Sequence, residues 1–134
     1  MYTFYPSGFF ARLEEDEIFA FGSNIQGIHG AGAAKYAKLR LGAIQGQGFG
    51  RQGQCFAIPT RELIGKKMVT LPLERIVPYV DAFRRYTQSN DHLSFLVTPL
   101  GTGLAKLEDK DIAPLFKGCV NCRFSTAWQP YLLN

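Results

Sequence analysis

The sequence lacks any long apolar run. No segment reaches the roughly 18 residues that a membrane-spanning helix needs, so we expect no contact with a membrane. The N-terminal stretch MYTFYPSGFFARLEEDE has neither a basic start nor a long apolar core, which distinguishes it from a secretory signal peptide. These absences predict a cytoplasmic protein. A length of 134 residues, without repeats or low-complexity segments, predicts one domain over 1–134.

Cysteine is scarce. Three cysteines, an odd number without a secretory signal, predict reduced thiols rather than a disulfide framework. Cys119 and Cys122 form a C-x-x-C, but a structural zinc site needs four ligands. The other candidate ligands, Cys55, His29 and His92, are scattered along the sequence. We therefore expect no metal and no cofactor, and we interpret Cys119 and Cys122 as small, partly buried thiols near a helix end.

The chain also lacks a basic stripe, although its net charge is +4. Its Arg and Lys residues are dispersed, whereas nucleic-acid binders more often gather them beside stacking aromatic side chains. Hydrophobic residues make up 46% and charged residues 19%, which argues against wholesale disorder. The charge favours an anionic partner and leaves a nucleic-acid-binding module open as an alternative.

Strand-like and helix-like stretches alternate along the chain. We expect strands where short apolar runs end in turn residues, and helices where helix formers or an i, i+3, i+4 apolar pattern occur. The expected strands are 17–21, 55–59 (ending at Pro59), 93–101 and 122–128, and the expected helices are 31–42, about 72–87 and 107–118. Segments 42–54 and 60–70 are expected to be loops. This alternation predicts an α/β fold with a mostly parallel central sheet and helices on both faces.

Two of these expected helices contain residues that indicate where the helix begins. Pro72 suits a first helical turn, but Pro78 removes a backbone hydrogen bond, at a cost of about 3 kcal/mol unless it is accommodated. We therefore expect a kink at Pro78 or a helix that begins near it. In the segment 107–118, Asp109 or Asp111 is expected to cap the helix.

A literal G-x-G-x-x-G occurs at Gly48–Gly53. The dinucleotide-binding fingerprint requires a strand before this motif and a helix after it. Here an expected loop precedes it and an expected strand follows it. We therefore interpret this motif as unrelated to dinucleotide binding.

Two other glycine-rich loops have a better context. The loop 22–32 follows the strand 17–21 and opens a helix, and the loop PLGTGLAKLED (99–109) also lies between a strand and a helix. Ligands of open parallel sheets bind beyond the carboxyl ends of the strands, and a helix N-terminus favours an anion. Two such loops on adjacent strands would face each other across one crevice, which suits a diphosphate. The alternative is that these glycines only form tight turns.

These segments resemble the macro domain, the ADP-ribose-binding fold. The resemblance covers about Glu17 to Cys122 and rests on IFAFGSN followed by HGAGAAKYAKLRLG, and on TPLGTGLAKLEDKDIAPLF. The loops are most similar to those of the branch that contains terminal ADP-ribose glycohydrolases, which read G-A-G and G-C-G-L. The resemblance implies a three-layer macro-domain-like fold, in which 1–16 would be an N-terminal extension atypical of the family.

The resemblance also implies which residues bind the ligand. Asn24 would lie near the distal ribose, the backbone of 30–32 would face that ribose and the diphosphate, and 101–104 would enclose the diphosphate from the other side. The expected ligand-binding residues are Gly22, Ser23, Asn24, Gly30, Ala31, Gly32, Thr60, Arg61, Gly101, Thr102, Gly103 and Leu104. A local turn is an alternative role for Asn24 and for Thr102.

The usual catalytic groups of the family are absent at the matching positions. Lys35 stands where many macro-domain hydrolases carry an Asp after the first loop. The glycohydrolase branch carries a Lys after the central strand and an Asp in the second loop, where this chain has Thr60 or Arg61 and Ala105. A guanidinium stays protonated and cannot replace a lysine nucleophile. His29, in the first loop, remains the candidate general base, with an exposed histidine of no catalytic role as the alternative.

The sequence therefore predicts a protein that binds ADP-ribose or an ADP-ribose-derived nucleotide through two glycine-rich loops. ADP-ribosyl hydrolysis stays open, through His29 or a substrate-assisted water. The alternatives are a non-catalytic sponge or sensor of an ADP-ribose-type signal and a nucleic-acid-binding module. An ADP-ribosylated protein or nucleic acid would be the macromolecular partner.

Overall fold

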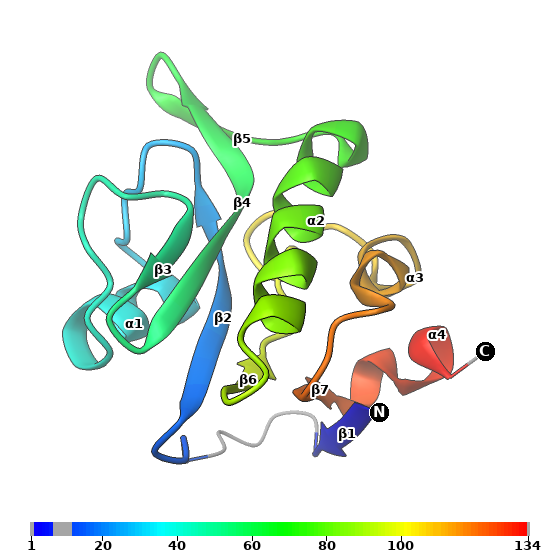
Figure 1. Ribbon diagram of the computed structural model, residues 1–134. Helices are drawn as coiled ribbons and strands as arrows, with labels where there is room; N and C mark the ends of the chain where they lie inside the picture. The colour runs from blue at the N-terminus through cyan, green and yellow to red at the C-terminus, as the bar shows by residue number, and fades with distance from the viewer. Residues whose placement is uncertain (1, 7–11, 134) are drawn as a thin grey trace.

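The computed structural model describes residues 2–6 and 12–133, which contain a seven-stranded sheet (Figure 1). The strands are β1 (Tyr2–Tyr5), β2 (Glu17–Asn24), β3 (Gly50–Gln52), β4 (Cys55–Ile64), β5 (Lys67–Thr70), β6 (Ser94–Val97) and β7 (Cys122–Ser125). Their order is β1-β7-β6-β2-β4-β3, and β5 pairs with β4 off this path. The first five strands in this order pair in parallel, whereas β3 and β5 run antiparallel to β4. The prediction of an α/β fold with a mostly parallel sheet is confirmed.

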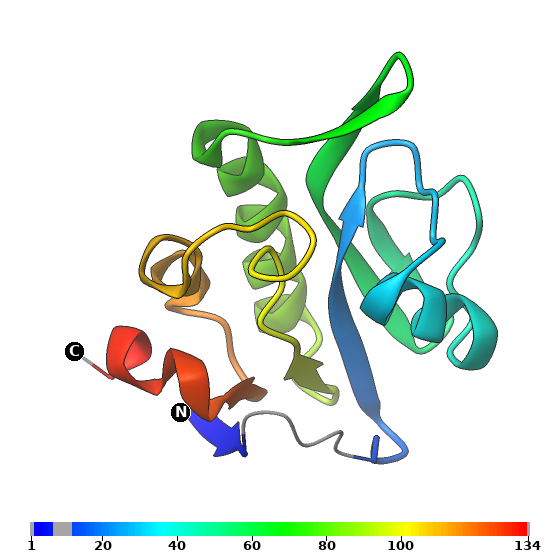
Figure 2. The same cartoon turned by 180° about the vertical axis from the view of Figure 1, so that it is seen from behind.

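Helices pack on both faces of this sheet (Figures 1 and 2). They are α1 (Gly32–Arg40), α2 (Leu73–Ser89), α3 (Asp109–Ile112) and α4 (Gln129–Leu132), with 3₁₀ turns η1 (Ala113–Phe116) and η2 (Thr126–Trp128). Successive side chains of a strand point to opposite faces. In β2, Phe19 and Phe21 pack in the apolar cluster that includes Ala37 of α1. Ile18 and Ala20 join the larger cluster, which contains the buried face of α2.

The N-terminal segment is part of the sheet. β1 pairs in parallel with β7, and Tyr2 lies opposite Cys122. The Tyr5 hydroxyl donates to the Val97 carbonyl of β6 at 2.7 Å. β1, which lies within the segment 1–16, therefore forms one edge of the sheet. Local sequence hides this role, since the partner strand lies near the other end of the chain.

The loop expected over 60–70 is a β-hairpin instead. β4 does not end at Pro59 but continues to Ile64, and β5 returns antiparallel to it. Proline is tolerated in a sheet where the ladder is irregular, and the β2–β4 register shifts beside Pro59, between Ser23 and Asn24. The hairpin projects beyond the rest of the molecule in both views (Figures 1 and 2).

The glycine-dense segment 42–54 contains β3. β3 pairs with β4 across a tight turn at Gly53, whose φ is +56°. A strand rather than a helix follows the G-x-G-x-x-G, so its interpretation as unrelated to the dinucleotide fingerprint is confirmed. A Cβ on Gly48 would lie 2.2 Å from the Asn24 carbonyl oxygen. Glycine at this position therefore allows the backbones of two loops to touch.

α2 runs without interruption from Leu73 through Pro78, so the expectation of a start near Pro78 is wrong. Pro78 lies in the second turn, and its missing N–H deprives the Glu74 carbonyl of its usual partner. The buried residues of α2 are Ile76, Val80, Phe83 and Thr87, and their packing on the sheet stabilises the helix around the proline. None of the helices in residues 2–6 and 12–133 has the length and apolar character needed to cross a bilayer.

Three other expected elements are confirmed with changed ends. α1 lies within 31–42, and Gly42 after it has a φ of +87°, a conformation that favours glycine beyond a helix C-terminus. β6 lies within 93–101 but ends before Thr98, where the second glycine-rich loop begins. β7 lies within 122–128, and the last three residues of that range form η2.

The short helix of 107–118 is also present, as α3 and η1, but its N-terminus differs from the expectation. The N-cap residue is Glu108, and its side chain makes no capping hydrogen bond. The Asp109 carboxylate accepts a hydrogen bond from Trp128 Nε1 at 2.8 Å. Asp109 therefore anchors the C-terminal segment, and the expectation that Asp109 or Asp111 caps this helix is wrong.

The three cysteines are free and buried. Cys119 and Cys122 are each 2% exposed, so they are more deeply buried than expected. A hydrogen bond with the Cys119 side chain and burial raise the pKa of Cys122. Burial raises the pKa of Cys55 to about 12. The thiols of Cys55 and Cys122 are therefore held in the unreactive protonated form, and burial shields all three from solvent.

We expect none of the three thiols to react with Ellman's reagent within minutes at pH 8, because all three are buried and the pKa values of Cys55 and Cys122 are raised. Addition of guanidinium chloride should release three equivalents of thionitrobenzoate. Absorbance at 412 nm measures both quantities. Rapid reaction of the native protein would contradict the burial of these side chains.

Candidate functional site

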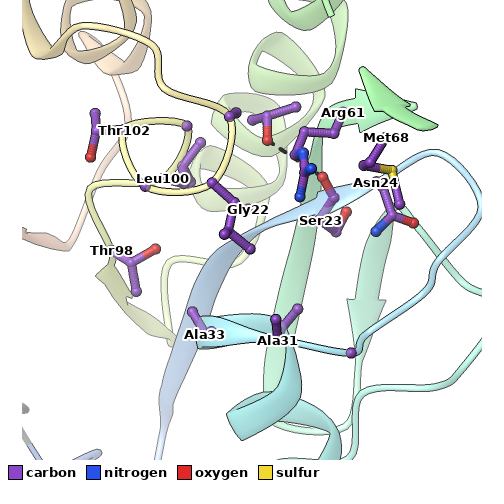
Figure 3. Close-up of a pocket in the computed structure, with 18 of the residues that line it drawn as sticks. Gly22, Ser23, Asn24, Ala31, Ala33, Arg61, Met68, Thr98, Leu100 and Thr102 are labelled. Carbon is purple, nitrogen blue, oxygen red and sulfur yellow. Dashed lines mark hydrogen bonds between the residues drawn. The ribbon is translucent and has the colours of Figure 1, made fainter. Parts of the chain in front are cut away.

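The two glycine-rich loops border one pocket of about 420 Å³ (Figure 3). This volume lies within the range of small-molecule sites. All twelve residues expected to bind a ligand line it: Gly22, Ser23, Asn24, Gly30, Ala31, Gly32, Thr60, Arg61, Gly101, Thr102, Gly103 and Leu104. The other lining residues are Ile28, Ala33, Ala34, Met68, Thr98, Pro99, Leu100 and Ala105. The structure therefore brings the two loops and the β4–β5 hairpin together around one space.

Strand order explains why the loops meet. β2 and β6 are adjacent and parallel, with Ala20 opposite Val97, so the loops that follow them leave the same edge of the sheet. A Cβ on Gly22 would lie 3.2 Å from the Cβ of Leu100, tighter than ordinary contact. Gly22 thus lets the second loop pack directly onto the end of β2.

The side chain of Asn24 braces the first loop. Its carboxamide nitrogen donates to the Ile28 carbonyl, and its oxygen accepts from the Ile28 N–H, each at 2.8 Å. This pattern confirms the local-turn interpretation of Asn24. The neighbouring Ser23 hydroxyl donates to the Gly48 carbonyl. Both polar side chains hold the loop in place rather than project free atoms into the pocket.

The N-terminus of α1 opens onto the same pocket. Ala31 is its N-cap residue, makes no side-chain capping bond, and lines the pocket beside Gly32 and Ala33. The first N–H groups of a helix have no acceptor within the helix. A Cβ on Gly30 would meet no other atom within 4 Å. The first loop therefore offers backbone N–H donors to an open space.

Hydrogen bonds fix the second loop as well. The Thr102 hydroxyl donates to the Pro99 carbonyl at 2.6 Å, which confirms its role in forming the turn. The Thr98 hydroxyl donates to the Ala20 carbonyl at 3.0 Å. The Thr70 hydroxyl of β5 donates to the Ala105 carbonyl at 2.7 Å. This last bond ties the β4–β5 hairpin to the second loop across the pocket wall.

Among the described residues that line the pocket, Arg61 is the one that carries a charge. It lies in β4 opposite Thr70, and its side chain reaches the pocket from the hairpin (Figure 3). Arg75, Arg84 and Arg123 each pair with a carboxylate. Within the described part of the chain, the Arg61 guanidinium makes no hydrogen bond or ion pair. Its N–H donors are therefore available to an anionic ligand.

His29 does not face the pocket. Its side chain is 1% exposed and is absent from the pocket lining. Its Nε2 lies 3.1 Å from the Gln47 carbonyl oxygen, and its ring packs edge-on against Phe21. The expectation of a ligand-facing loop histidine is wrong, as is the alternative of an exposed one. His29 instead anchors the first loop to the segment 42–54, and its role as a general base has no geometric support.

The described lining contains no side chain suited to moving a proton near neutral pH. It includes no Asp, Glu, His, Lys or Cys. Ala105 lines the pocket, whereas Lys35 lies outside it, on the exposed side of α1. Neither position therefore supplies a carboxylate to the pocket. The pocket is suited to bind an anionic ligand that has both polar and apolar groups.

Several apolar residues of the lining were not expected from the sequence. Met68 comes from β5, a segment expected to be a loop, so no sequence signal indicated that it lies near the glycine loops. Ile28 and Leu100 lie next to expected site residues in the sequence. Their position inside the two loops is the signal that could have identified them.

Comparisons of the chain with protein-family models, curated proteins and solved structures give no significant match.

Proposed function

We propose that this α/β domain has a macro-domain-like fold and binds ADP-ribose or an ADP-ribose-derived nucleotide without hydrolysing it. It would then act as a sponge or sensor of such a ligand. The observation that carries this proposal is the convergence of both glycine-rich loops and the unpaired Arg61 on one pocket. The sequence resemblance named these residues as ligand contacts, and the geometry supports that role.

The polar groups of the pocket suit a diphosphate. The N–H groups at the start of α1 carry the positive end of the helix dipole, and Arg61 adds a full positive charge. No acidic side chain in the described lining would repel a phosphate. Gly30 and Gly103 leave open space in which a ligand can approach the backbone.

The same pocket supports binding more than turnover. A general acid or base typically contributes about 10²- to 10⁴-fold to a rate, and the described lining contains no carboxylate, imidazole or amine. A nucleic-acid-binding module is less well supported, because one recessed cation differs from the basic stripe that tracks a phosphate backbone.

Titration with ADP-ribose tests the proposal. A concentration a hundredfold above Kd should stabilise the fold by about 2.7 kcal/mol, seen as a rise in Tm. AMP and ribose 5-phosphate should stabilise it much less, because each fills half of the pocket. Incubation with an ADP-ribosylated protein should release little free ADP-ribose. No change in Tm at millimolar ADP-ribose would overturn the binding proposal, and rapid release would overturn its non-catalytic part.

Arg61→Gln should weaken ADP-ribose binding by roughly ten- to a hundredfold, because hydrogen bonds to a charged group contribute about 1.5–3 kcal/mol. Isothermal titration calorimetry measures this change. Arg85→Gln is the matched control, since Arg85 is exposed on α2 and lies outside the pocket lining. Equal affinities of the two variants would show that Arg61 does not contact the ligand.

A further inference from the structure

Three apolar side chains from three separate segments line the pocket. Ile28 belongs to the first loop, Leu104 to the second loop and Met68 to β5. We call this set the apolar rim. Ile28 is 37% exposed and Leu104 is 59% exposed, so neither is used to fill the protein core. Large apolar side chains that are exposed together at a pocket commonly mark a surface that a ligand covers.

Most polar side chains of the pocket form hydrogen bonds with the protein's own backbone. Asn24 bonds to both backbone atoms of Ile28. The hydroxyl groups of the remaining polar lining residues donate to main-chain carbonyls: Ser23 to Gly48, Thr60 to Ser23, Thr98 to Ala20 and Thr102 to Pro99. Arg61 is the exception, and a guanidinium is a donor only. No carboxylate or free carboxamide in the described lining is thus placed to accept a hydrogen bond from the 6-amino group of adenine.

We propose that the apolar rim holds the base of the bound nucleotide through its flat faces, so the site selects an ADP-ribose-like diphosphate but hardly distinguishes one purine from another. This inference rests on the proposed function. Apolar contact does not depend on the pattern of donors and acceptors at the edge of a base. A site built from hydrogen bonds to one substituent rejects the analogue that lacks it by about 10⁴- to 10⁵-fold, whereas an apolar site discriminates weakly.

The position of Arg61 fits this division of roles. In the hairpin, Arg61 lies opposite Thr70 and Met68 lies opposite Leu63. Figure 3 shows the side chains of Arg61 and Met68 reaching the pocket from this same hairpin. One segment therefore supplies both a cation for phosphate and an apolar side chain for the base.

The test compares ADP-ribose with its hypoxanthine analogue, in which an oxo group replaces the 6-amino group. Calorimetric Kd values for the two should agree within about threefold. Leu104→Ala should weaken both ligands by about fivefold, because part of a leucine's burial is lost, and should leave their ratio unchanged. Leu133→Ala is the matched control: Leu133 has the same exposed fraction, 59%, but lies outside the pocket lining. It should change neither Kd.

The outcomes separate the two proposals. If ADP-ribose bound tightly and the hypoxanthine analogue bound at least about thirtyfold more weakly, the inference would be overturned and the proposed function would remain intact. Unchanged affinity of Leu104→Ala would also overturn the inference alone, because the rim would then not contact the base. Failure of both ligands to bind the unmodified protein would overturn both proposals.

Discussion

Gly30→Val and Gly103→Val should each weaken ADP-ribose binding by about a hundredfold or more while the protein stays folded, because the new side chain takes the ligand's space. Both glycines line the pocket, and a Cβ on either would meet no protein atom within 4 Å. Neither has the positive φ that disfavours a side chain. Calorimetric titration measures the loss of binding, and thermal unfolding measures the stability of the same variants.

Gly48→Ala provides the contrast. The alanine Cβ at position 48 would lie 2.2 Å from the Asn24 carbonyl oxygen, so this substitution should lower Tm. Gly32 is a poor choice for the experiment, because its φ of +59° would add backbone strain to any blocking effect. If the variants at Gly30 and Gly103 lost stability and binding in parallel, the glycines would serve the turns rather than a ligand.

Arg123→Met should lower the free energy of unfolding by about 3 kcal/mol. Glu17 is 2% exposed, and Arg123 Nε and Nη2 each donate to its carboxylate at 2.6 Å. The pair connects β2 to β7 across β6. Removal of the arginine would leave a buried carboxylate without its cation, and breaking such a pair costs more than the intact pair contributes. Urea unfolding monitored by circular dichroism measures the change.

Arg75→Met is the matched control, because it breaks an Arg–Glu pair at the surface. The Arg75 and Glu62 side chains are 49% and 26% exposed, and such pairs contribute about 0–1 kcal/mol. The double variant Glu17→Leu/Arg123→Met should recover most of the lost stability, since no unpaired charge remains. A single Arg123→Met variant as stable as Arg75→Met would show that water replaces the guanidinium at Glu17.

The sequence was most informative where signals were local. The apolar run of β2, the glycines after it and the helix formers of α1 lie next to one another, so one short segment predicts strand, loop and helix. The second glycine-rich loop follows β6 in the same manner. Because the carboxyl ends of parallel strands share one edge of a sheet, the prediction that both loops border one pocket is confirmed.

Features that depend on distant partners could not be predicted. Pro59 suggested the end of a strand, but the register shift that accommodates it belongs to the ladder with β2. The burial of His29 follows from its contacts with Gln47 and Phe21, which no sequence pattern predicts. That the Arg61 guanidinium has no carboxylate partner among the described residues is likewise a tertiary property, since it depends on which carboxylates form ion pairs with the other arginines.

The parallel pairing of β1 with β7 delays completion of the sheet during synthesis. β1 leaves the ribosome long before β7, so β1 has no neighbouring strand to pair with until Cys122 and the rest of β7 have been synthesised. Contacts between residues so far apart form slowly, because the entropy of closing a long loop opposes them. The ends of β2, β4 and β6 form the pocket, and β2 pairs with both β4 and β6 without needing β7. We therefore expect the nascent chain to assemble the walls of the pocket first, while β1 stays accessible to chaperones until the last strand emerges.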